Sequence, residues 1–78
     1  MLKEKFTYDF SNIVVLGGGI SGVGAALLAI DQGYDVFLSN RDELKSAFAK
    51  ALQTHNIPFE TGNHSMERIL KASLIVKS

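Results

Sequence analysis

The chain has 78 residues, a length that fits one small domain and leaves no room for a second. Apolar residues make up 46% of it and charged residues 21%, which is typical of a globular protein and not of a disordered one. Eight basic side chains balance eight acidic ones and cysteine is absent, so the sequence predicts no nucleic-acid partner, no disulfide and no thiolate metal site.

The first half of the chain predicts a strand, a helix and a second strand after a short leader. Residues 1–12 carry alternating aromatic side chains, and we expect an N-terminal arm or an edge strand there. Ile13–Leu16 is an apolar run rich in β-branched residues, as in a strand buried on both faces. A helix rich in alanine and leucine is predicted over Ser21–Gln32, and a second strand over Asp35–Ser39.

The second half continues the same alternation. A helix is predicted from Asp42 to about His55, with the Asp42 carboxylate near its positive end. A third strand is expected over Pro58–Thr61, a third helix over about Ser65–Ala72 and a fourth strand over Leu74–Val76. Because this last strand runs straight into the end of the sequence, we expect a truncated domain of a longer protein.

Strands that alternate with helices through short connections imply right-handed crossovers and a parallel sheet. The predicted fold class is therefore α/β: a Rossmann-like parallel sheet of about four strands with helices on both faces, formed by residues 13–78. The uncharged stretch Ile13–Ile30 has clustered glycines where a membrane helix would be weakest. We expect no membrane partner and a cytoplasmic location.

A glycine-rich turn stands between the first strand and the first helix. Gly17, Gly19 and Gly22 fit the pattern G-x-G-x-x-G in the context that gives it meaning. Glycine permits a tight turn and a close approach of phosphate, while the free amides and the dipole of the helix attract an anion. We expect phosphate at these glycines and at Ile20 and Ser21, the plainer alternative being a tight turn that binds nothing.

The end of the second strand bears on which phosphate ligand is bound. An NAD site expects an acid there to hold the ribose hydroxyls, but the residues are Ser39, Asn40 and Arg41, and Asp42 comes too late. Arg41 suits the 2′-phosphate of NADP or the base of another nucleotide, or it is simply solvated. From the residues alone, an NADP-binding oxidoreductase domain and a non-enzymatic nucleotide-sensing module both stay open.

The remaining candidate residues are expected to be structural, solvated or part of the core. No catalytic pair and no metal site is predicted, and His64 is expected to be structural or exposed. Glu60, Glu67 and Arg68 are interpreted as solvated charges, and Met66 as part of the core.

The stretch IVVLGGGISGVGAALLAIDQGYDVFLSNRD, followed by IPFETGNHSMERILKASLIVKS, resembles the N-terminal domain of the Mur ligases. That family has a glycine-rich turn after the first strand, an Asp-x-Arg-like triplet after the second, a G-x-H segment, and an apolar strand leading into Ser-Pro-Gly. The chain departs from this pattern at Ser39 and Ser73, where the family has acids.

The resemblance implies a domain that binds UDP-N-acetylmuramoyl-L-alanine for an ATP-dependent, amide-forming ligase that adds D-glutamate during peptidoglycan precursor synthesis. It implies diphosphate at Gly19–Gly22 and uracil beside Ser39, Asn40 and Arg41. ATP and magnesium are expected in a central domain and the incoming amino acid in a C-terminal one. Neither domain fits in these residues, so we expect no cofactor in this chain and no ligase activity from it alone.

Overall fold

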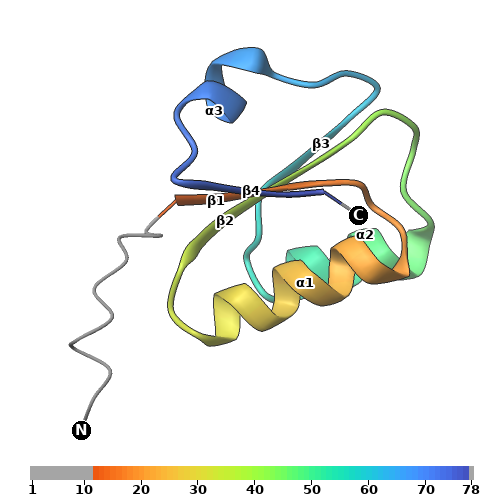
Figure 1. Cartoon of the computed structure of the whole chain (residues 1–78). Coiled ribbons are helices and arrows are strands. Elements are labelled where there is room, and N and C mark those ends of the chain that lie inside the picture. Colours follow the sequence, from red (N-terminus) through yellow and green to blue (C-terminus); the bar gives the residue numbers. More distant parts are fainter. Residues whose placement is uncertain (1–11, 78) are drawn as a thin grey trace, which may run out of the picture.

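Four strands alternate with three helices in the computed structural model, which describes residues 12–77. The elements are β1 (Asn12–Leu16), α1 (Ile20–Asp31), β2 (Asp35–Asn40), α2 (Ser46–Thr54), β3 (Phe59–Thr61), α3 (Met66–Leu70) and β4 (Leu74–Lys77) (Figure 1). This order confirms the predicted Rossmann-like α/β class. The arm or edge strand expected over residues 1–12 lies, apart from Asn12, outside the described residues.

All neighbouring strands are parallel, in the order β3-β2-β1-β4. In the middle of the sheet, Val14 pairs with Phe37 on one side and with Ile75 on the other. The chain runs outward from β1 to β2 and β3, then crosses back to place β4 on the far side of β1. Open α/β sheets bind ligands at the carboxyl ends of the strands where the order reverses, which here is between β1 and β4.

The helices cover the sheet unequally. α1 and α2 lie side by side on one face, and α3 lies on the other (Figure 1). Because strand side chains alternate between faces, one set from β1 and β2 points toward α1 and α2. That set, its helical partners and Ile57, which lies between α2 and β3, form the buried core cluster of Ile13, Val15, Val23, Ala26, Val36, Leu38, Leu52 and Ile57.

The second helix begins later than the sequence predicted. α2 starts at Ser46 and not at Asp42, whose main-chain carbonyl accepts a hydrogen bond of 2.7 Å from Asn40 Nδ2. Leu44 packs against the core cluster from the loop that precedes the helix. Leu44, Phe48 and Leu52 stand four residues apart, as on one face of a helix, and the prediction was too long because the first of them lies in the loop.

The third helix is poorly covered. It has no buried residue, and Met66 is 59% exposed, so the interpretation of Met66 as core is wrong. Arg68 is not purely solvated either, because its guanidinium carbon lies 4.1 Å from the centroid of the Phe37 ring. This contact places α3 over β2 on the face opposite α1 and α2.

Candidate functional site

The glycine turn is tied to the end of β2 by two hydrogen bonds. Gly17 has a φ of 118°, a conformation that L side chains rarely adopt, and its N–H donates to the Ser39 carbonyl at 2.9 Å. The Gly18 N–H donates to Asn40 Oδ1, also at 2.9 Å. The turn is therefore held to the strand that carries the predicted base-binding residues.

Gly18 is the glycine that packs most closely, although the pattern G-x-G-x-x-G does not include it. It is buried, and a Cβ at this position would collide with the Leu44 side chain and lie 3.0 Å from Asn40 Cγ. Sequence reasoning missed this role, and the only available signal was the unbroken run of three glycines. By contrast, Gly24 is exposed and has open space around it, so its small size is not what lets α1 approach the strand.

The start of α1 presents main-chain donors. Gly19 is the N-cap residue, and among residues 12–77 no side chain caps the helix. The first hydrogen bond of the helix is donated by the Val23 N–H to the Gly19 carbonyl at 2.9 Å, so the amides of residues 20–22 precede it. Ser21 is exposed and Ile20 is 78% exposed, which leaves this end of the helix open to an anionic ligand.

The three residues expected beside the base have different environments. Ser39 has an exposed fraction of 0%, and Asn40 is half-buried with its amide engaged by Gly18 and Asp42. Arg41 is exposed and is therefore the side chain of this triplet that can reach a ligand. That the triplet borders a nucleotide base stays a prediction.

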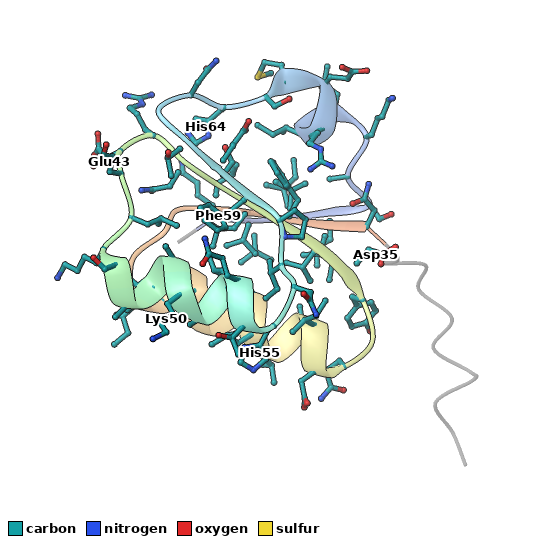
Figure 2. The ribbon with its side chains drawn as sticks, turned by 180° about the vertical axis from the view of Figure 1, so that it is seen from behind. Asp35, Glu43, Lys50, His55, Phe59 and His64 are labelled. Carbon is teal, nitrogen blue, oxygen red and sulfur yellow. The ribbon has the colours of Figure 1, made fainter. Side chains whose placement is uncertain are left out.

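A polar cluster on the α3 face of the sheet links the ends of β2 and β3. The Ser39 hydroxyl lies 2.7 Å from Glu60 Oε2 and 2.6 Å from His64 Nδ1, and Glu60 Oε2 also accepts the Ser65 N–H. His64 and Glu43 lie at one end of the molecule, and Asp35 lies at the other (Figure 2). The cluster therefore lies, like the glycine turn, at the carboxyl ends of the strands.

Two residues of this cluster differ in how well the sequence predicted them. The interpretation of Glu60 as a solvated charge is wrong, because its carboxylate is half-buried and hydrogen-bonded. His64, which was expected to be structural or exposed, is half-buried and contacts the Ser39 hydroxyl through Nδ1. Outside the cluster, Glu67 is solvated as predicted, since its 3.4 Å ion pair with Lys71 joins side chains that are 79% and 70% exposed.

A hollow of about 670 Å³ lies away from this edge, near the amino ends of the strands. Its lining includes Asn12, Asp35, Phe37, Glu67 and Arg68, and none of its residues belongs to the glycine turn or to the triplet after β2. The glycine turn is the candidate site, because parallel sheets bind ligands at their carboxyl ends. No helix within residues 12–77 has the length and apolar character needed to span a bilayer.

Comparisons with known proteins bear on the family of the chain. No family model matches the chain. Curated relatives do match, and proteins from three different bacteria share the name UDP-N-acetylmuramoylalanine–D-glutamate ligase. The protein from Cytophaga hutchinsonii is 56% identical over 66 residues, and that from Bacteroides fragilis is 47% identical over 66 residues. Each of these two alignments covers 85% of this chain.

The match from Porphyromonas gingivalis is 44% identical over 75 residues and covers 96% of this chain. The chain spans only about 15% of the length of these relatives, in their N-terminal part. The matches confirm the resemblance: by sequence, the chain is related to the N-terminal part of the UDP-N-acetylmuramoylalanine–D-glutamate ligases.

Proposed function

We propose that the carboxyl edge of the sheet binds the UDP end of UDP-N-acetylmuramoyl-L-alanine, as the first part of a ligase that adds D-glutamate. The observation that carries the proposal is the tie between the glycine turn and the end of β2, made by the Gly18 N–H and Asn40 Oδ1 at 2.9 Å. It brings an open helix start and Arg41 to one edge of the sheet. The name shared by the relatives supplies the substrate and the reaction.

In this proposal the diphosphate accepts hydrogen bonds from the amides of residues 20–22 and from the Ser21 hydroxyl, at the positive end of α1. Ile20 gives an apolar border to the same anion site. Arg41 contacts the base, while Ser39 and Asn40 act by fixing the strand end and the turn. These roles require no charged group in the turn, because main-chain donors and the helix dipole provide the attraction.

The ligase reaction itself needs residues outside this chain. The sequence contains no G-x-x-x-x-G-K-[ST] loop, so we assign ATP and magnesium to other segments of the longer enzyme. There ATP would convert the substrate carboxylate into an acyl phosphate, which the amine of D-glutamate attacks. A reaction that consumes ATP fits the cytoplasmic location expected from the sequence.

Titration of the isotope-labelled chain tests the proposal. UDP and UDP-N-acetylmuramoyl-L-alanine are expected to shift the amide signals of residues 19–22 and of Arg41. NADP should produce smaller shifts at the same concentration, and NADH smaller ones still. Because the chain supplies only one wall of an inter-domain cleft, contacts from the other wall are lost. We therefore expect affinity for UDP near the millimolar level, about −4 kcal/mol. Stronger, saturable shifts with NADP centred on Arg41 would reject the proposal in favour of an oxidoreductase domain.

A matched pair of serine variants sharpens the test. Ser21→Ala is expected to weaken UDP binding tenfold or more, because a hydrogen bond to a charged group contributes about 1.5–3 kcal/mol. Ser46→Ala, at the start of α2, should leave UDP binding unchanged. Equal affinities for the two variants would show that Ser21 does not touch the phosphate.

A further inference from the structure

The polar cluster of Ser39, Glu60 and His64 has a hydrogen-bonding pattern that determines where its protons lie. The Ser39 hydroxyl has one proton but two close partners, Glu60 Oε2 at 2.7 Å and His64 Nδ1 at 2.6 Å. Asn63 O, at 3.4 Å, is a distant third. Ser39 must therefore donate to one close partner and accept from the other.

Glu60 is the acceptor in this arrangement. Its Oε2 atom also receives the Ser65 N–H, so it collects two donors, as a carboxylate does. The Ser39 hydroxyl then donates its proton to Glu60 and must accept a hydrogen bond from His64. The imidazole consequently carries a proton on Nδ1, and in its neutral form Nε2 is an acceptor.

His64 Nε2 is open to solvent, and Ser39 links the imidazole to the glycine turn. Within residues 12–77 no buried side-chain nitrogen or oxygen lacks a partner, and the hydrogen bond found for this half-buried imidazole uses Nδ1. Ser39 also accepts the Gly17 N–H through its carbonyl at 2.9 Å. One buried residue therefore joins the imidazole to the turn.

We propose that His64 is a specificity-determining residue of the nucleotide site, held in the Nδ1–H tautomer by Ser39 and Glu60 so that Nε2 accepts a hydrogen bond from a donor on the nucleoside. The inference rests on the proposed function for its ligand, whereas the tautomer stands independently of it. A nucleoside such as uridine offers two such donors, the imide N–H of the base and the ribose hydroxyls. Phosphate offers none when fully ionised, so this contact distinguishes a nucleoside diphosphate from a bare diphosphate.

Nitrogen NMR of the histidine side chains in the ligand-free chain tests the tautomer. In its neutral form, His64 is expected to show a protonated Nδ1 and an unprotonated Nε2. Ser39→Ala should convert it to a form with substantial protonation at Nε2. His55 is the internal control, because its Nδ1 lies 3.0 Å from the Ala51 carbonyl, which only accepts, and it should not respond to Ser39→Ala. The assigned tautomer would be wrong if His64 of the wild type were protonated at Nε2, or if Ser39→Ala left its protonation pattern unchanged.

Titration with UDP tests the contact to the ligand, with inorganic pyrophosphate as the control. UDP is expected to move the His64 Nε2 resonance toward its protonated range, and pyrophosphate is expected to shift only the amides of residues 20–22. UDP methylated at N3 and 2′,3′-dideoxy-UDP tell the two kinds of donor apart, since the first lacks the imide N–H and the second lacks both ribose hydroxyls. If UDP shifts the amides but leaves Nε2 unchanged, the His64 contact is wrong and the proposed function stands. If UDP shifts neither, the proposed function and the contact both fail, while the tautomer is still decided.

Replacement of the imidazole gives a second measurement. His64→Asn keeps an N–H near the position of Nδ1 for Ser39 but has nothing at the position of Nε2. We expect UDP affinity to fall about fivefold, the effect of one neutral hydrogen bond, with pyrophosphate binding unchanged. Equal loss of affinity for both ligands, or no loss for UDP, would contradict a specific contact to the nucleoside.

Discussion

The two faces of the sheet are covered to very different degrees. On one face α1 and α2 pack against β1 and β2, and Ala26, Leu38 and Leu52 have exposed fractions of 0%. On the other face Val14 and Phe37 of the sheet are buried, but no residue of α3 is, and Leu70 is 76% exposed. Because burial of apolar surface is the main favourable term in folding, the α1/α2 face provides most of the free energy of folding.

The candidate site is divided in the same way. Successive side chains of β2 alternate between faces, so Asn40 points toward the packed face and Ser39 toward the α3 face. Leu44 and Asn40 pack closely against the glycine turn, and Asn40 also accepts the Gly18 N–H, whereas Glu60 and His64 hold the loop after β3 by hydrogen bonds alone. One wall of the site thus depends on the core, and the other on a polar cluster.

The comparison predicts its largest effect from a matched pair of leucines in helices. Leu52→Ala in α2 should lower the free energy of unfolding by about 2–5 kcal/mol, since it empties a fully buried position. Leu70→Ala in α3 should change it by less than about 0.5 kcal/mol. Urea denaturation followed by circular dichroism measures both.

A small domain can lose its structure altogether when such a core position is emptied, and Leu52→Met covers that case. It keeps the volume and should cost less than about 1.5 kcal/mol. Equal sensitivity at positions 52 and 70 would show that α3 contributes to the core as much as α2 does.

The sequence predicted the packed face well because periodicity reports burial directly. The apolar run of β1 and the alternation of strands with helices were enough for the sheet and its class. The same reasoning failed for Met66, because an apolar stripe shows which face of a helix is apolar but not whether any element covers it. Burial on the α3 face was therefore overestimated.

The polar part of the site was harder to predict for a different reason. Ser39 contacts Glu60 and His64, which lie 21 and 25 positions later in the sequence. Their meeting depends on the register of β2 against β3, which places Ser39 opposite Glu60, and hydrophobic periodicity does not determine that register. The close packing of Gly18 was missed for a similar reason. Its neighbour Leu44 lies in a loop, and the sequence does not show where a loop places its side chains.

A glycine pair gives the next largest effect and probes the packed wall of the site. Gly18→Ala should destabilise the chain by about 1–3 kcal/mol, because the new methyl group displaces the Leu44 side chain and presses on Asn40. Gly24→Ala has open space in the interior of α1 and should stabilise by about 0.4–1 kcal/mol. Thermal unfolding of the two variants should show shifts of opposite sign, and a Gly18→Ala variant as stable as Gly24→Ala would show that the turn is loosely packed.

The smallest predicted effect concerns the aromatic contact that joins α3 to the sheet. Arg68 stacks on Phe37 at 4.1 Å, and such a contact at an exposed site contributes about 0.5–1 kcal/mol. Arg68→Ala should therefore lower the free energy of unfolding by that amount, and Arg68→Leu should lose less because it keeps apolar cover over the ring.

Lys71→Ala removes the exposed ion pair with Glu67 and should cost less than about 0.5 kcal/mol, an effect that disappears in high salt. Urea titrations at low and high salt separate the two cases, since stacking on the ring includes apolar contact that salt does not screen. If Arg68→Ala behaved like Lys71→Ala at both salt concentrations, the guanidinium would not anchor α3, and the helix would be held to the sheet by its flanking chain alone.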